Sequence, residues 1–179
     1  MRASPRAARR RGRSAEVKVL IAYQSRYGAT EGCARRLAQL IGDGASLVNL
    51  SKERRPALDG FDIVLIGGPI YAGKLPRAVL AFCERERNRL LERRVGLFIC
   101  CLYRDERAAA ELRSAFPDWL ATHAFAADWL GGELHPDRLS CVHRLLVRSI
   151  PGATGDISQI RDEAVRGLAE ATKALLPRA

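Results

Sequence analysis

The stretch Gln24-Ser25-Arg26-Tyr27-Gly28-Ala29-Thr30 joins an apolar run at residues 17–23 to a segment at residues 30–41 whose apolar residues recur at helical spacing. A polar loop that contains glycine therefore lies between the end of a buried strand and the start of a helix. Such a loop gathers backbone N–H groups at the positive end of the helix dipole, and Ser25 and Thr30 add hydroxyls. The sequence predicts an anion site here, most naturally for a phosphate.

The spacing of this loop, hydroxyl-x-x-Gly-x-Thr, narrows the interpretation. It lacks the GxGxxG of dinucleotide-binding loops and the Lys-Ser/Thr ending of a P-loop. It resembles the phosphate loop of flavodoxins, which holds the monophosphate of FMN by hydrogen bonds. A capped turn without a ligand explains the same residues equally well, because Ser, Gly and Thr are common in turns and helix caps.

Composition bounds the class of protein. The chain has 179 residues, of which 47% are hydrophobic and 28% charged, and this suits one compact α/β domain. No apolar run approaches the roughly 20 residues of a membrane-spanning helix, so we expect a cytoplasmic protein that is soluble or peripheral on the inner face of the membrane. The five cysteines form no CxxC pair and no metal-ligand spacing with the three histidines, which favours core packing in a reducing cytosol.

The net charge of +10 comes largely from an arginine-rich tail at residues 1–15, which contains no acidic residue. We expect this tail to be disordered, because it has no apolar period to bury. It lacks the apolar stretch of a signal peptide. A basic arm of this kind could touch nucleic acid or anionic lipid, although nucleic acid is not an expected partner, and a start codon chosen too early would explain it as well. Residues 16–179 would form the folded domain.

Strand-like and helix-like segments alternate along the folded part. We expect strands at residues 17–23, 45–50, 61–68, 95–102 and 124–130, and helices at residues 30–41, after Pro76, over residues 105–120 with a break at Pro117, and from a capping box at Asp156. The pattern is strand then helix repeated five times, and it is least clear over residues 51–60. By the right-handed crossover rule it predicts an α/β fold, a doubly wound five-stranded parallel sheet of order 2-1-3-4-5 with helices on both faces.

Three loops of such a sheet would meet where the strand order reverses, outside the carboxyl ends of the strands. The first loop, Ser25–Thr30, would hold phosphate. The second, Gly68–Lys74, would bring Tyr71 and nearby backbone against a planar ring. The third, Leu102–Arg104, would offer N–H groups and the Arg104 side chain to the polar edge of that ring. The predicted cofactor-binding residues are Ser25, Arg26, Tyr27, Gly28, Ala29, Thr30, Pro69, Ile70, Tyr71, Ala72, Leu102, Tyr103 and Arg104.

The sequence Gly-Gly-Pro-Ile-Tyr-Ala-Gly-Lys at residues 67–74, with Val-Gly-Leu-Phe-Ile-Cys-Cys-Leu at residues 95–102, resembles the flavodoxin-domain proteins related to bacterial menaquinone-dependent protoporphyrinogen oxidase. The resemblance covers about residues 17–176. It implies a flavodoxin-like fold that binds FMN at the three loops. It also implies protoporphyrinogen IX oxidation with a quinone as electron acceptor, in heme biosynthesis and beside the membrane that holds the quinone. Tyr27 departs from the usual loop, which has a second hydroxyl residue there, so its backbone N–H would serve the phosphate.

Two other functions stay open. One is a flavodoxin-type electron carrier without a substrate of its own, although a carrier is expected to present an acidic docking face and this chain is not acidic. The other, weaker option is a nucleic-acid-binding module with a decayed flavin site, suggested by the basic tail. No residue is predicted to be catalytic or to bind a metal, because a bound flavin would itself carry the electrons. The expected partners are a quinone or redox partner, a porphyrinogen substrate and an anionic membrane.

A basic amphipathic helix is predicted within residues 134–150. Its apolar residues are Leu139, Val142, Leu145, Leu146 and Ile150, and positive charge comes from Arg138, His143, Arg144 and Arg148. Such a helix would lie on an anionic membrane or frame an apolar, carboxylated substrate. A helix that only packs on the domain, with its arginines in water, fits the pattern at least as well.

Overall fold

The structure is a computed structural model in which residues 17–134 and 157–177 are described. A parallel sheet has the strand order β2-β1-β3-β4-β5, which confirms the predicted doubly wound topology. Its strands are β1 (Val19–Tyr23), β2 (Ala45–Asn49), β3 (Ile63–Pro69), β4 (Arg94–Cys100) and β5 (Ala126–Trp129). The predicted basic tail and the apolar residues of the predicted amphipathic helix lie outside the described residues.

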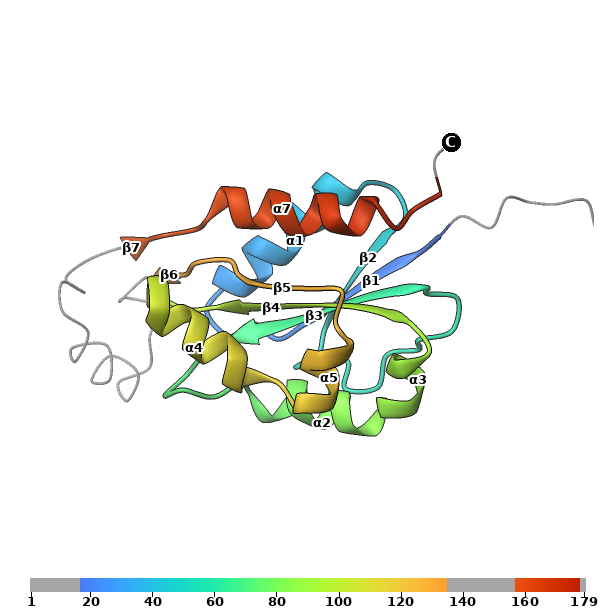
Figure 1. The fold of residues 1–179 in the computed structure, drawn as a ribbon, viewed down its shortest axis with the longest axis horizontal. Coiled ribbons are helices and arrows are strands. Elements are labelled where there is room, and N and C mark those ends of the chain that lie inside the picture. Colours follow the sequence, from blue (N-terminus) through green and yellow to red (C-terminus); the bar gives the residue numbers. More distant parts are fainter. Residues whose placement is uncertain (1–16, 135–156, 178–179) are drawn as a thin grey trace, which may run out of the picture.

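Helices cover both faces of the sheet, as predicted (Figure 1). One face carries α1 (Ala29–Ile41) and α7 (Asp162–Lys173). The other face carries α2 (Arg77–Arg85), α3 (Arg87–Leu91), α4 (Asp105–Ala115) and α5 (Asp118–His123). Beyond the end of β5, β6 (Glu133–Leu134) pairs antiparallel with β7 (Ile157–Ser158).

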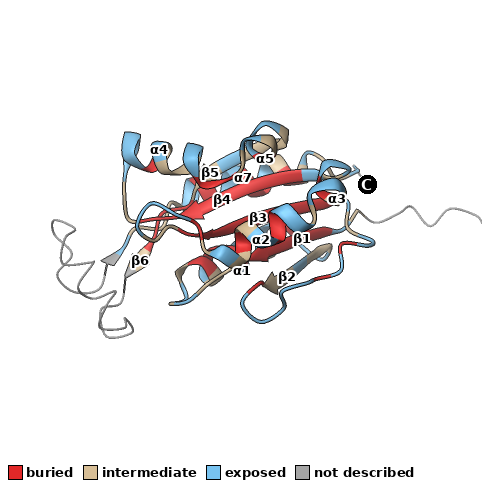
Figure 2. Cartoon of the chain, turned by 90° about the horizontal axis from the view of Figure 1, so that it is seen from below, coloured by how far each residue is buried: buried red, intermediate tan, exposed pale blue. Residues whose placement is uncertain are grey.

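The central strands form because their sequences are apolar at almost every position. All residues of β1 and β3 are buried, and in β4 only Arg94 is exposed. Such runs are typical of parallel strands covered on both faces, and Figure 2 shows the buried residues concentrated in these strands. The edge strand β2 is only partly buried.

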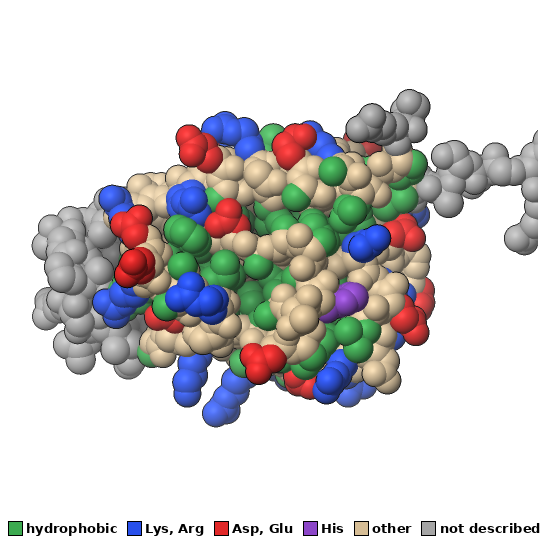
Figure 3. Space-filling view, viewed as in Figure 1, with side chains coloured by type: hydrophobic (Ala, Val, Ile, Leu, Met, Phe, Trp, Pro, Cys, Tyr) green, Lys and Arg blue, Asp and Glu red, His purple; other side chains and the backbone are tan. Residues whose placement is uncertain are grey.

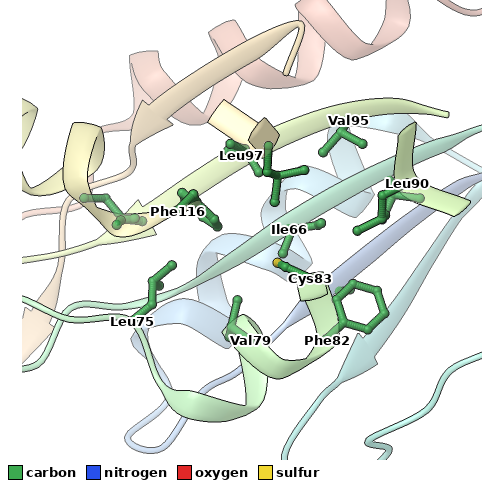
Figure 4. Packing of buried hydrophobic residues seen from close by; sticks show 14 of the residues in the cluster. Ile66, Leu75, Val79, Phe82, Cys83, Leu90, Val95, Leu97 and Phe116 are labelled. Carbon is green, nitrogen blue, oxygen red and sulfur yellow. The ribbon is translucent and has the colours of Figure 1, made fainter. Parts of the chain in front are cut away.

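Alternating side chains divide the core into two clusters, one on each face of the sheet. The α2–α5 core includes Leu20, Val64, Ile66 and Leu97 of the sheet with Val79, Phe82, Cys83, Leu90 and Phe116 of the covering segments (Figure 4). The α1–α7 core includes Ile21, Leu65 and Phe98 of the sheet with Cys33, Leu37, Val165 and Leu168 of the two helices. Burying one such side chain fully contributes roughly 1.5–3 kcal/mol, so both layers are needed for stability.

The outer edge of β5 is lined by apolar side chains, which gather in a hollow between α7 and the α4–α5 side (Figure 3). Among the described residues, no strand pairs with this edge. Its carboxyl end is covered by Arg161, whose guanidinium donates to Asp128 Oδ1 at 2.9 Å and to the Trp129 carbonyl at 2.8 Å. The same guanidinium lies 4.0 Å from the centroid of the Trp129 ring. A charged group therefore takes the place of a further strand at this end.

The predicted alternation was wrong between β2 and β3, because the described chain has no helix there. The connection is held instead by two fully buried leucines, Leu50 and Leu58. Its carbonyl groups accept hydrogen bonds from distant arginines: Arg85 donates to the Arg54 carbonyl at 2.6 Å, and Arg93 donates to the Leu58 carbonyl at 3.3 Å. Side chains therefore satisfy backbone groups that a helix would have satisfied internally.

Two helices also differ from prediction in their bounds. The last helix begins at Asp162 and not at Asp156, because Ile157–Ser158 pairs with β6. The helix after Pro76 is interrupted at Glu86, which separates α2 from α3. Within the first helix, the apolar residue Leu40 is 37% exposed, whereas Cys33 is buried.

The four cysteines of the described segments, Cys33, Cys83, Cys100 and Cys101, are free and buried, which confirms the predicted core packing. Burial raises the pKa of the Cys83 thiol to about 12 and that of the Cys101 thiol to about 11. These thiols stay protonated at neutral pH. None of the helices within residues 17–134 and 157–177 has the length and apolar character needed to cross a membrane.

Candidate functional site

The three predicted loops follow β1, β3 and β4, which are neighbours in the sheet. The strand order reverses between β1 and β3, since β2 lies on the far side of β1 and β4 on the far side of β3. Carboxyl ends of parallel strands share one edge, so these loops meet at the place where open α/β sheets bind ligands. The structure therefore brings the predicted residues of the three loops to one edge.

The first loop is shaped by Gly28, whose φ of 103° lies in the left-handed region that favours glycine. The Gly28 N–H donates to Ser25 Oγ at 3.2 Å, which closes the turn before α1. No atom lies within 4 Å of the position that a Cβ on Gly28 would take, so the loop is open at this point. Among the described residues, no side chain caps the start of α1, and its first N–H groups are available to an anion.

Thr30 lies inside the first turn of α1 and is 1% exposed. Its hydroxyl hydrogen-bonds with the thiol of Cys100, the last residue of β4. The pKa of Cys100 is raised well above the ordinary value, first by its hydrogen bond with Cys33 and then by burial, while the Thr30 hydroxyl acts in the opposite direction. The Thr30 side chain thus fastens the first loop to β4, and it is the N–H groups of this turn that face the open loop.

The second loop is a tight turn from Tyr71 to Lys74. The Tyr71 N–H donates to the Lys74 carbonyl at 3.0 Å, and the Lys74 N–H donates to the Tyr71 carbonyl at 3.1 Å. Both central residues have positive φ, 48° at Ala72 and 76° at Gly73, as a type I′ turn requires. For Ala72 this conformation costs about 1–2 kcal/mol. The loop begins at Ile70, whose N–H donates to the Cys100 carbonyl at 2.9 Å.

The first two loops touch through their tyrosines. The rings of Tyr27 and Tyr71 are 6.3 Å apart at 84°, an edge-to-face contact. The Arg26 guanidinium lies 5.5 Å from the centroid of the Tyr27 ring. Burial, and secondarily the nearby Tyr27, raises the pKa of Tyr71 to about 12, although Arg26 lowers it. The Tyr71 hydroxyl therefore keeps its proton at neutral pH.

The third loop is held from two sides. The guanidinium of Arg107, a residue in the first turn of α4, lies 3.6 Å from the centroid of the Tyr103 ring. Arg104 Nε donates to Gln159 Oε1 at 3.0 Å, so this side chain contacts the segment before α7. Leu102 is partly buried between these anchors. The loop thus presents Tyr103 with its position fixed by α4.

Sequence reasoning missed Arg107, Gln159 and Gln24. The spacing of Tyr103 and Arg107, four residues apart at the start of a predicted helix, is a signal that could have identified the first. Gln159 lies 55 residues after Arg104, and nothing local marks that contact. Gln24 directly follows β1, and its Oε1 is buried with no hydrogen-bond partner in the described part of the chain.

Residues 20–159 match the family of flavodoxin domains, and this range includes all three loops. The chain belongs to the flavodoxin domain family. This membership confirms the predicted flavodoxin-like domain and, with it, FMN as the predicted cofactor. Among curated proteins, none matches the sequence.

Solved structures with similar folds include the flavodoxin of Megasphaera elsdenii, with 18% identity and a TM-score of 0.54 over 87% of this chain and 98% of that chain. The WrbA-like protein of Agrobacterium tumefaciens has 14% identity and a TM-score of 0.52 over 89% and 94% of the two chains. Rubredoxin:oxygen oxidoreductase of Desulfovibrio gigas has 17% identity and a TM-score of 0.56 over 88% of this chain, which spans about a third (35%) of the length of that protein. At these identities the likeness concerns the fold.

The residues present fit FMN by their chemistry. The glycine and hydroxyl loop at the start of α1 suits a phosphate monoester, and the tyrosines of the loops suit a planar ring. The buried Oε1 of Gln24 is an acceptor that a hydroxyl of the ribityl chain would satisfy. Within the described ranges, no group of three His, Cys, Asp or Glu side chains is placed to hold a metal ion.

Proposed function

We propose that this chain is an FMN-dependent oxidoreductase that binds FMN with the loops after β1, β3 and β4. The observation that carries the proposal is the convergence of a glycine and hydroxyl loop with three tyrosines at the point of strand-order reversal in a flavodoxin domain. Tyr27 follows β1, Tyr71 follows β3 and Tyr103 follows β4. These three strands are neighbours in the sheet. A turn that bound nothing would not need aromatic side chains from all three loops.

Each part of the site has a task in this function. Ser25 and the N–H groups that begin α1 bind the phosphate, and Gly28 keeps the approach open. The loop tyrosines orient the ring system and exclude water from one side of it. The Tyr71 hydroxyl stays protonated at neutral pH, so it keeps the O–H group of a hydrogen-bond donor. When bound, FMN supplies the electron-transfer chemistry.

For the substrate, we propose protoporphyrinogen IX as electron donor and a quinone as acceptor, in heme biosynthesis at the inner face of the membrane. Support comes from the resemblance of residues 67–74 and 95–102 to the menaquinone-dependent protoporphyrinogen oxidases. Exposed arginines at the loops, Arg26 and Arg104, suit the carboxylates of a porphyrin.

An electron carrier without its own substrate is the second candidate. The tip of the second loop, at Ala72, Gly73 and Lys74, is exposed beside the site, and such a rim allows a protein partner to approach a bound flavin. This observation favours docking by a redox protein over enclosure of a small substrate.

The decisive experiment measures FMN first and turnover second. Purified full-length protein is titrated with FMN, and binding is read from the quenching of flavin fluorescence. The FMN-loaded protein is then mixed anaerobically with protoporphyrinogen IX, followed by menadione. Two results support the oxidase: protoporphyrinogen IX rapidly bleaches the flavin absorbance, and menadione restores that absorbance over repeated turnovers. An FMN-loaded protein that protoporphyrinogen leaves oxidised, but that a ferredoxin-type reductase reduces, supports the carrier.

A further inference from the structure

Three arginines at the site loops have contacts other than ion pairs, whereas several arginines elsewhere on the described part of the domain are paired with carboxylates. Ion pairs with carboxylates hold Arg35, Arg36, Arg85, Arg89, Arg93 and Arg161. In the described segments, no carboxylate forms an ion pair with Arg26, Arg104 or Arg107. Arg26 and Arg107 lie over tyrosine rings instead, and Arg104 bonds to a neutral amide.

Arg107 makes the shortest cation–ring contact in the described part of the chain. Its distance of 3.6 Å from the Tyr103 centroid compares with 4.0 to 5.8 Å in the other cation–ring contacts of the described chain. Tyr103 in turn packs against the α2–α5 core, so its ring cannot turn freely. The ring therefore fixes a positive charge beside the third loop of the site.

Acidic groups also lie near this loop, and they are placed differently. Asp105 and Glu106 are in the first turn of α4, where backbone N–H groups stabilise a carboxylate. Glu111 lies toward the second loop, 3.7 Å from the position that a Cβ on Gly73 would take. Among the charged groups near the third loop, Arg107 alone lies over the ring of Tyr103 in the described part of the chain.

We propose that Arg107 is a positioning residue whose charge favours binding of reduced FMN over oxidised FMN. Without this charge, the affinity of the site for reduced FMN would fall relative to its affinity for oxidised FMN. This inference rests on the proposed function, because FMN has to bind. At neutral pH, two-electron reduction of free FMN takes up two electrons and one proton, which leaves one additional negative charge on the ring system. A fixed guanidinium beside the site lowers the free energy of that added charge and so raises the midpoint potential.

The test uses the full-length, FMN-loaded protein and three variants. Arg107→Gln removes the charge, Arg107→Lys keeps it, and Arg113→Gln removes a charge from the last turn of the same helix as a matched control. The dissociation constants of oxidised FMN and of dithionite-reduced FMN are measured anaerobically for each protein. We expect Arg107→Gln to raise the ratio of the reduced to the oxidised constant about tenfold, equivalent to a fall of about 30 mV in the two-electron potential.

The two other variants set the limits of the inference. Arg107→Lys should keep the wild-type ratio to within about threefold, because a lysine retains the charge, and Arg113→Gln should leave it unchanged. An Arg107→Gln ratio equal to that of Arg113→Gln overturns the inference, as does a lysine variant that behaves like the glutamine variant. A wild-type protein that binds no FMN at all refutes the proposed function itself, which is a different result from normal binding with an unchanged ratio.

Discussion

The ring of Phe98 occupies the space that a side chain on Gly67 would fill. The two residues are partners in the ladder between β3 and β4, and ring carbons of Phe98 lie at the position of a Cβ on Gly67. Phe98 is fully buried in the α1–α7 core. Close packing of an aromatic ring across the strands therefore requires glycine at this position in β3.

Replacing Gly67 with alanine should destabilise the fold. The added methyl group meets a buried ring that cannot leave the core, and overpacking of this kind costs roughly 1–3 kcal/mol. The free energy of unfolding is measured in urea. Gly32→Ala is the control, because nothing lies within 4 Å of its Cβ position in α1, and alanine there should add about 1 kcal/mol of stability. Equal effects of the two substitutions would contradict the packing argument.

Gly28→Val should weaken FMN binding at least tenfold. A branched side chain resists the positive φ of this residue, with a strain of about 1–3 kcal/mol, and it fills the open part of the first loop. Gly42→Val is a matched control, because Gly42 has a similar φ of 99° at the opposite end of α1. Both variants should lose stability in urea, whereas only Gly28→Val should change the dissociation constant measured by flavin fluorescence. Loss of affinity in both would show that strain in α1, and not the loop, is responsible.

Thr30→Ala should weaken FMN binding several-fold, because it releases the first loop from β4. The comparison is Thr172→Ala, which also removes a buried threonine hydroxyl, one that donates to the Leu168 carbonyl at 2.7 Å in α7. Each substitution should cost about 0.5–1.5 kcal/mol of stability. If Thr172→Ala reduces FMN affinity as much as Thr30→Ala does, the contact with Cys100 has no specific role in the site.

The stability of the protein should fall between pH 10 and about 12, in part through Tyr71. Burial raises the pKa of this phenol from 10.0 to about 12. In that window the unfolded chain has lost the proton and the folded chain still holds it, so the free energy of unfolding decreases as pH rises. Tyr71→Phe should reduce this decrease when urea unfolding at pH 9 and pH 11, about one unit either side of the ordinary value, is compared. An unchanged decrease would mean that other groups, such as the thiol of Cys101, account for all of it.

Much of the fold could be predicted because β1, β3 and β4 are continuous apolar runs, and their alternation with helical segments determines the topology. The connection between β2 and β3 could not be predicted, because Arg85 at the end of α2 and Arg93 between α3 and β4 satisfy its carbonyl groups. The start of α7 was missed for a related reason, since β7 exists only through its pairing with β6. These interactions join segments far apart in sequence, so local sequence patterns do not predict them.

The candidate site shows the same division. The three loops were predicted from strand ends, which local apolarity reveals. The orientation of Arg104 toward Gln159 depends on where the segment before α7 lies, and the buried oxygen of Gln24 depends on the packing of the finished fold. Position along the chain thus indicated which residues meet, whereas side-chain direction came from the tertiary structure.

The contact between the first and last helices also has a consequence for synthesis of the chain. α1 and α7 lie side by side on one face of the sheet (Figure 1), and Arg36 forms an ion pair with Asp162 at 2.7 Å. The apolar face shared by β1 and β4 therefore stays half covered until the last helix has left the ribosome. A nascent chain that ends before residue 162 leaves the α1–α7 core partly uncovered, and exposed apolar surface of this kind promotes aggregation during folding.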